Sequence, residues 1–105
     1  MISVTVTFGN ISAASSQNYA KVIVFTAVAG VNSYTEDGSA SPPTSAVADL
    51  VKLVGKDIGT EIFKVEMDGS DLLTSSVLVT WNDTTFTISP YVTVSGGERI
   101  IIWYY

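Results

Sequence analysis

The sequence predicts one mainly β domain over residues 1–105, a single antiparallel β-sandwich or barrel-like domain with one short helix. Valine, isoleucine and threonine make up about a third of the chain, and their branched side chains favour pleated strands. Several segments alternate apolar and polar residues with the two-residue period of a half-buried strand. A chain of 105 residues has room for one core, so we expect no second domain.

The N-terminal half is expected to contain two strands and a long loop. From Ile2 to Phe8 every second residue is apolar, which predicts a half-buried strand. The segment from Lys21 to Ala29 is apolar on both faces, which predicts a central strand covered on both sides. Residues 31–43 are mostly polar and include two adjacent prolines, so they are expected to form an exposed, mobile loop.

Residues 44–54 are expected to form the short helix. Four apolar residues recur there at the spacing of one helix face, and Gly55 follows as a stop signal. The residues on that face are Val47, Leu50, Val51 and Val54. A two-residue alternation through part of the same segment leaves a strand open as the alternative.

The C-terminal half is expected to be a meander of antiparallel strands. The strands are predicted at Ile62–Met67, Val77–Trp81, Thr85–Ser89, Tyr91–Val94 and Arg99–Tyr105. Asp68-Gly69 and Asn82-Asp83 supply short turns, and Gly96-Gly97 supplies a hairpin between the last two strands. In the last strand, alternation predicts that one set of residues packs in the core. That set is Ile101, Trp103 and Tyr105.

The residue types exclude most catalytic arrangements. The chain has no histidine and no cysteine, which rules out a Ser-His-Asp triad, a thiolate nucleophile and a zinc–thiolate site. Neither a serine–lysine motif, a nucleophile elbow nor a phosphate-binding glycine loop is present. Paired carboxylates of a glycosidase would leave no sequence signature, but we expect no enzyme and no cofactor.

One acidic turn is a candidate calcium site. Asp68 and Asp71 flank a glycine and a serine, and oxygen-rich turns of this kind can bind calcium. The full spacing of a calcium loop with its distal glutamate is missing, and Asp and Gly are favoured in turns for backbone reasons. We therefore expect a turn there and no metal site.

The charge distribution argues against nucleic acid and anionic membranes as partners. The net charge is −5, and the five cations do not cluster in the sequence. The cations are Lys21, Lys52, Lys56, Lys64 and Arg99. The N-terminus alternates where a signal peptide would be continuously apolar, and no segment has the length of a membrane span, so we expect a product made for the cytoplasm.

Aromatic residues near the C-terminus are the candidate interface. Three consecutive aromatics end the chain, and aromatic side chains are enriched in the cores of protein interfaces. The candidate interface residues are Trp81, Tyr91, Trp103, Tyr104 and Tyr105. A strand this apolar would aggregate if it stayed uncovered, so we expect the core or another subunit to cover it.

These features favour a structural role in a multi-subunit assembly. Only 14% of residues are charged, whereas serine and threonine supply about a quarter of the chain, a profile suited to a subunit flanked by neighbours. We expect a homo-oligomeric structural protein with protein partners, of the kind that decorates phage capsids. Two alternatives stay open: a ubiquitin-like β-grasp adaptor, from the order strand, strand, helix, strands, and a carbohydrate-binding β-sandwich with Trp81, Tyr91 or Trp103 as a stacking platform.

Overall fold

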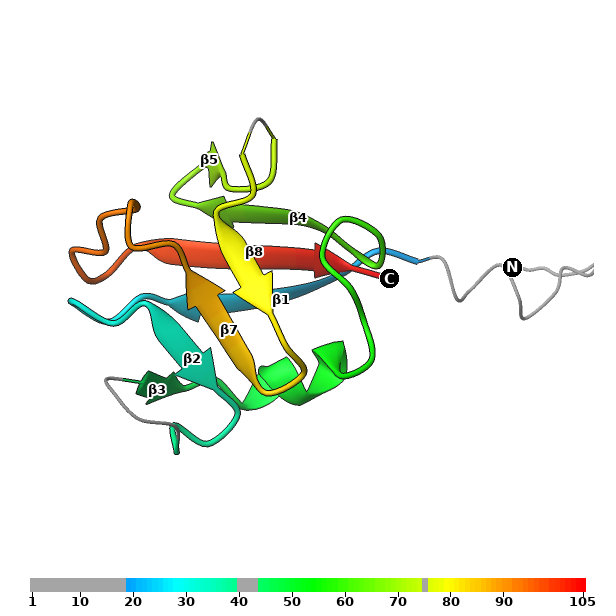
Figure 1. Ribbon diagram of the computed structural model, residues 1–105, viewed down its shortest axis with the longest axis horizontal. Coiled ribbons are helices and arrows are strands. Elements are labelled where there is room, and N and C mark those ends of the chain that lie inside the picture. Colours follow the sequence, from blue (N-terminus) through cyan, green and yellow to red (C-terminus); the bar gives the residue numbers. More distant parts are fainter. Residues whose placement is uncertain (1–18, 40–43, 75) are drawn as a thin grey trace, which may run out of the picture.

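The computed structural model describes residues 19–39, 44–74 and 76–105 (Figure 1). The strand predicted at Ile2–Phe8 and the two prolines of the predicted loop lie outside the described residues. The strands are β1 (Lys21–Thr26), β2 (Ser33–Thr35), β3 (Thr44–Ala46), β4 (Ile62–Met67), β5 (Ser70–Asp71), β6 (Val79–Trp81), β7 (Thr85–Ile88) and β8 (Arg99–Tyr104). A 3₁₀ helix, η2, spans Ala48–Leu53.

The strands form two four-stranded sheets in a sandwich-like arrangement, which confirms the predicted fold class. The orders are β1-β8-β4-β5 in the first sheet and β3-β2-β7-β6 in the second. The strands of the second sheet run at a steep angle to those of the first, with β6 (yellow) passing over β8 and β7 (orange) over β1 (Figure 1). Between the named strands, pairing is antiparallel except between β2 and β3, which pair in parallel. A β-grasp fold would have one sheet packed on a helix. The described residues form two sheets packed on each other, which does not match that alternative.

The core lies between the two sheets and is closed at one side by η2. The first sheet contributes Ile23, Ile62, Val65, Ile100, Ile102 and Tyr104, the second contributes Tyr34, Val79, Phe86 and Ile88, and the helix contributes Leu50 and Leu53. The Tyr34 ring packs against Phe25 with 4.9 Å between ring centroids. Both sheets therefore bury their inner faces in one shared core.

Strand β8 faces the core with the set of residues opposite to the predicted one. Ile100, Ile102 and Tyr104 are buried, whereas Ile101 and Trp103 are only partly buried on the outer face. The prediction was wrong because Ile100-Ile101-Ile102 contains no polar residue to mark the solvent side. Pairing with β1, which puts Ile23 opposite Ile102, sets the orientation.

Among the described strands, β1 lies at the edge of its sheet and is not the central strand that its composition predicts. Within the described residues it pairs only with β8, which holds the inner position between β1 and β4. Its inner residue Ile23 is buried, but Val22 and Val24 on the outer face are 52% and 46% exposed. The apolar residues on both faces of β1 thus give one core face and one apolar surface.

The first half of the predicted mobile loop is ordered sheet. Strand β2 lies between β3 and β7, and its residues Tyr34 and Thr35 are buried. The exposed turn begins only at Glu36. The three-residue strand was missed because its polar sequence carries no periodic signal, and its pairing with β7 joins residues about 50 positions apart.

The predicted helix over residues 44–54 is shorter and of another type. Residues 44–46 form β3, and the helix that follows is 3₁₀, with Leu50 and Leu53 buried three residues apart. Val51 and Val54, predicted on the buried face, are exposed. The 3₁₀ spacing explains the difference, because residues three apart share one face of such a helix.

Short turns in the C-terminal half largely follow the prediction, with one exception. Asp68 and Gly69, with φ of 49° and 85°, form the two-residue turn between β4 and β5. Residues 91–94 form no strand, so the hairpin predicted at Gly96-Gly97 was wrong. Gly97 instead pairs with the residue that follows β1, where its N–H donates to the Ala27 carbonyl at 2.8 Å.

Candidate functional site

An apolar strip crosses the outer face of β1 and β8. In the register of the two strands, Val22 lies opposite Trp103 and Val24 opposite Ile101. We call these four residues the outer strip. About half of each valine surface is exposed, and the two β8 residues are partly buried. Single exposed apolar residues are ordinary on proteins, but cross-strand neighbours form a contiguous patch.

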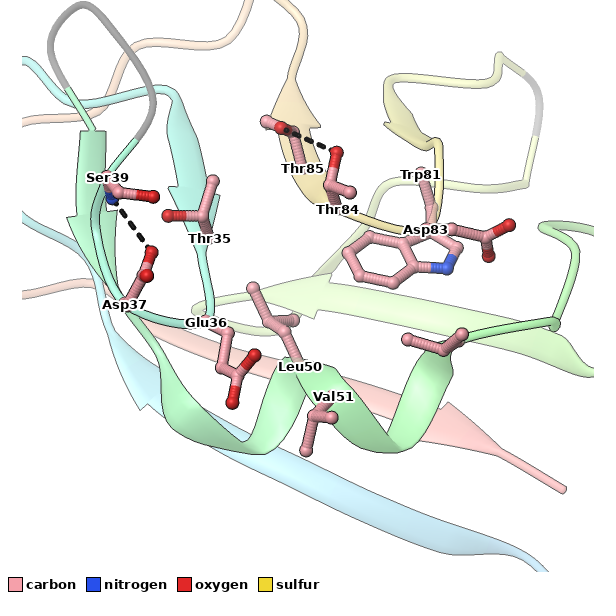
Figure 2. Close-up of a pocket in the computed structure, with 11 residues that line it drawn as sticks. Thr35, Glu36, Asp37, Ser39, Leu50, Val51, Trp81, Asp83, Thr84 and Thr85 are labelled. Carbon is pink, nitrogen blue, oxygen red and sulfur yellow. Dashed lines mark hydrogen bonds between the residues drawn. The ribbon is translucent and has the colours of Figure 1, made fainter.

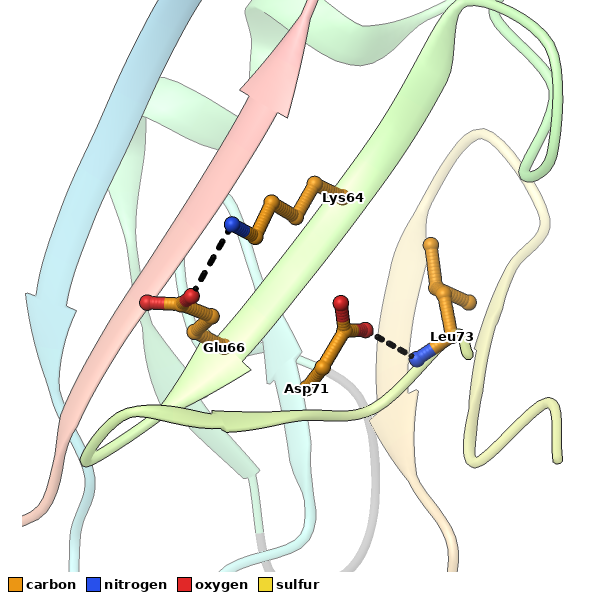
Figure 3. A network of polar contacts seen from close by, with 4 residues as sticks. All are labelled: Lys64, Glu66, Asp71 and Leu73. Atoms are coloured by element: carbon orange, nitrogen blue, oxygen red, sulfur yellow. Dashed lines mark hydrogen bonds and ion pairs between the residues drawn. The ribbon is translucent and has the colours of Figure 1, made fainter. Parts of the chain in front are cut away.

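Charged residues of β4 border the outer strip. The Lys64 ammonium lies 4.9 Å from the centre of the Trp103 ring. It also forms an ion pair with Glu66 at 3.1 Å, and both side chains point toward β8 (Figure 3). The ammonium charge is therefore balanced by the neighbouring carboxylate. An apolar centre with a polar rim is the usual anatomy of a protein interface.

The structure does not bring the five predicted interface aromatics onto one surface. Trp103 lies in the outer strip, but Tyr104 is buried in the core. Tyr105 stacks on Phe63 with 4.6 Å between ring centroids. Tyr91 is 93% exposed in the segment after β7. Trp81 is partly buried, and its indole N–H donates to the Leu53 carbonyl at 2.9 Å.

The two aspartates of the candidate calcium turn are engaged by backbone groups. Asp68 Oδ1 accepts a hydrogen bond from the Arg99 N–H at 2.8 Å. Asp71 Oδ1 accepts one from the Leu73 N–H at 2.8 Å (Figure 3). These bonds fix the turn and the chain that leaves β5. Across the described parts of the chain, no group of three acidic, cysteine or histidine side chains is arranged to hold a metal ion.

A second feature is a cleft of about 240 Å³ beside Trp81, which we call the Trp81 cleft. It lies between the turn after β2, the helix η2 and the turn between β6 and β7 (Figure 2). The lining residues are Thr35, Glu36, Asp37, Ser39, Leu50, Val51, Val54, Trp81, Asp83, Thr84 and Thr85. Among the described lining residues there are three carboxylates and no lysine or arginine, so the cleft has negative potential.

Backbone hydrogen bonds hold two of these carboxylates in place. Asp37 Oδ1 accepts from the Ser39 N–H at 3.0 Å, and hydrogen bonding by the side chain and the backbone of Ser39 lowers the pKa of Asp37. Asp83 Oδ1 accepts from the Gly55 N–H at 2.9 Å. Asp83 adopts φ of 76°, a conformation that aspartate tolerates better than most residues. Both side chains are thereby oriented before anything binds.

The buried wall of the cleft contains a hydroxyl without a partner. Thr35 is 6% exposed, and its Oγ1 has no hydrogen-bond partner among the described residues. Figure 2 shows this hydroxyl directed toward the turn that carries Asp37 and Ser39. Buried polar atoms are nearly always hydrogen-bonded, so this hydroxyl is a polar group of the cleft wall that the described residues leave unsatisfied.

Sequence reasoning identified Trp81 and Trp103 but missed the residues around them. The cleft combines segments from β2, η2 and the β6–β7 turn, and no short motif marks such a combination. No protein-family model matches the chain, and neither a curated protein nor a solved structure matches it. The fold and its surfaces define a small β-sandwich-like protein with an apolar outer strip and an acidic cleft. Within the described residues, no helix is long and apolar enough to cross a membrane.

Proposed function

We propose that the protein is a non-catalytic structural subunit that associates with other copies of itself through the outer strip. The observation that carries this proposal is the exposure of Val22 and Val24 next to Trp103 on a sheet face. Burying such a face removes apolar surface from water at about 25 cal/mol per Å². The strip therefore offers a partner apolar surface to cover.

A second copy is the partner that fits the strip best. The strip itself carries no charge, and the nearest ammonium, that of Lys64, is balanced by Glu66. An uncharged patch is complementary to itself, which is what a two-fold interface requires. A strongly acidic or basic partner surface would gain nothing from it. The particular assembly that we propose, from the low charge and the serine- and threonine-rich composition, is a virion lattice that such subunits decorate.

The test is a change in solution mass on placing a charge in the strip. Val24→Lys puts an ammonium in the middle of the strip at a half-exposed position, where the core is not disturbed. Thr80→Lys, at an exposed position of β6, is the matched control. In light scattering over a concentration series, we expect wild type and Thr80→Lys to form a discrete oligomer and Val24→Lys to stay monomeric.

Two outcomes contradict the proposal. A wild-type protein that is monomeric at every concentration would exclude self-association. An oligomer that survives both Val24→Lys and Trp103→Ala would place the interface elsewhere. In contrast, the outer strip would be supported as the contact if iodide quenched the Trp103 emission in the monomer but not in the oligomer.

A further inference from the structure

The charges of the Trp81 cleft are unbalanced. Glu36 and Asp37 lie on one side and Asp83 on the other (Figure 2). All three side chains are exposed, and together they give this concave surface a negative potential. None of the described residues that line the cleft is a cation. A cation would therefore be attracted to the cleft from solution.

Between the carboxylates the cleft is apolar. Leu50, Val51 and Val54 of the helix segment line it from one side, and the Trp81 ring lines it from the other. The hydrogen bond from the Trp81 N–H to Leu53 fixes the ring against the helix. A hydrated inorganic cation would gain nothing from this surface. An organic cation with an aliphatic stem would bury its stem there and could place its charge against the indole.

The unpartnered hydroxyl of Thr35 favours a ligand that donates hydrogen bonds. A hydroxyl oxygen accepts from N–H groups, and Thr35 Oγ1 is buried at the cleft wall without any partner. A guanidinium has five N–H donors in one plane, enough to reach a carboxylate and a hydroxyl together, and it stacks on aromatic rings. An ammonium matches this arrangement less well, because it is compact and more strongly hydrated.

Two other ligand classes fit the observations less well. The described residues include no group of three carboxylates arranged around one metal ion, so the charges are spread along the cleft. A neutral sugar could stack on Trp81, but it would leave the negative charge of the cleft unbalanced.

We propose that the Trp81 cleft binds an arginine side chain from a basic segment of a partner protein. This site is separate from the outer strip and does not depend on it.

The test is a fluorescence titration with an arginine peptide. In a Trp103→Phe background Trp81 is the only tryptophan, so its emission reports on the cleft. The probe is hexa-arginine, and the control is hexa-citrulline, which has the same shape without the charge. We expect saturable quenching by hexa-arginine, weakened at high salt because the Debye length shortens, and none by hexa-citrulline.

Variants assign the binding to the cleft. Glu36→Gln and Asp83→Asn each remove one charge with little change of shape, and we expect each to weaken hexa-arginine binding about fivefold. Asp49→Asn is the matched control. Asp49 lies on η2, the helix beside the cleft, but it does not line the cleft and pairs with Lys52. Val24→Lys should bind as wild type does, which separates this site from the outer strip.

Three outcomes would overturn the proposal. Equal quenching by hexa-arginine and hexa-citrulline would show that charge does not select the ligand. An affinity that Asp49→Asn lowers as much as Glu36→Gln would reflect the net charge of the protein and no specific site. Saturable quenching by glucose, mannose or N-acetylglucosamine without any by hexa-arginine would make the cleft a sugar site.

Discussion

At the scale of single residues, Tyr34 links the core to the segment between β1 and β2 through its hydroxyl. It is fully buried at the centre of the core and lies on β2. Its hydroxyl donates to the Val31 carbonyl at 2.7 Å and accepts from the Val28 N–H at 3.2 Å. The hydroxyl thereby satisfies two backbone groups of the segment that leads from β1 into β2. Burial of a tyrosine is favourable only with such partners.

The same residue predicts a loss of stability at alkaline pH. Burial raises the pKa of Tyr34 above its ordinary value of 10.0, the charge of Glu98 adds to this, and the Val28 N–H opposes it. The unfolded chain therefore ionises at this residue first, near pH 10. The stabilisation by the neutral phenol is complete below about pH 10 and is lost as the pH rises toward the higher folded-state pKa.

Urea unfolding between pH 8 and pH 11 measures this effect. We expect the free energy of unfolding of wild type to fall more steeply above about pH 10 than that of Tyr34→Phe. Tyr91→Phe is the control, because Tyr91 is 93% exposed, and it should follow wild type. Parallel curves for wild type and Tyr34→Phe would contradict the assignment.

Gly96 is a second residue with a defined steric role. Its φ is 104°, and a Cβ there would lie 2.9 Å from the Ala29 Cβ, too close for two carbon atoms. Gly97 has a similar φ of 91° but nothing within 4 Å of a Cβ. Both alanine variants carry the cost of positive φ, about 1–2 kcal/mol, so their difference isolates the close approach.

We therefore expect Gly96→Ala to be less stable than Gly97→Ala by about 1–3 kcal/mol in urea unfolding, the usual cost of overpacking. Equal losses would mean that Ala29 moves aside freely. The sequence predicted positive φ at both glycines but not this difference. The difference depends on Ala29, about 67 positions earlier in the chain, and no local pattern reports that approach.

At the scale of elements, the best-predicted parts are those whose geometry is local. Strand β4 has the predicted bounds, and its turn at Asp68-Gly69 follows from residues that tolerate positive φ. The mistakes concern elements whose partners are distant. The exposed outer face of β1 depends on its pairing with β8, and the existence of β2 depends on its pairing with β7. Both partners are distant in the chain, so the local sequence carries no signal of them.

The orientation of β8 gives the prediction at this scale. Ile102 is fully buried, whereas its neighbour Ile101 lies on the outer face. We expect Ile102→Ala to cost about 2–5 kcal/mol of unfolding free energy, as a cavity in the core does, and Ile101→Ala about 1 kcal/mol. Urea unfolding at low protein concentration measures both. A larger loss for Ile101→Ala would show that the strand faces the other way.

At the scale of the whole molecule, the chain passes repeatedly between the two sheets. It runs from β1 in the first sheet to β2 and β3 in the second, back to β4 and β5, over to β6 and β7, and finally to β8. Neither sheet is thus made from one continuous segment. The two sheets share one core, so unfolding of one sheet would expose the apolar inner face of the remaining sheet to water. We therefore expect the described domain to unfold in one cooperative transition.

The two tryptophans allow this expectation to be measured sheet by sheet. Trp103 lies on β8 of the first sheet and Trp81 on β6 of the second. Trp81→Phe leaves a reporter in the first sheet, and Trp103→Phe leaves one in the second. Within each variant, the urea midpoint from tryptophan emission should equal the midpoint from far-ultraviolet circular dichroism, which reports both sheets together. If the second sheet melted first, the emission of Trp103→Phe would change before its dichroism, and the shared core would not couple the sheets.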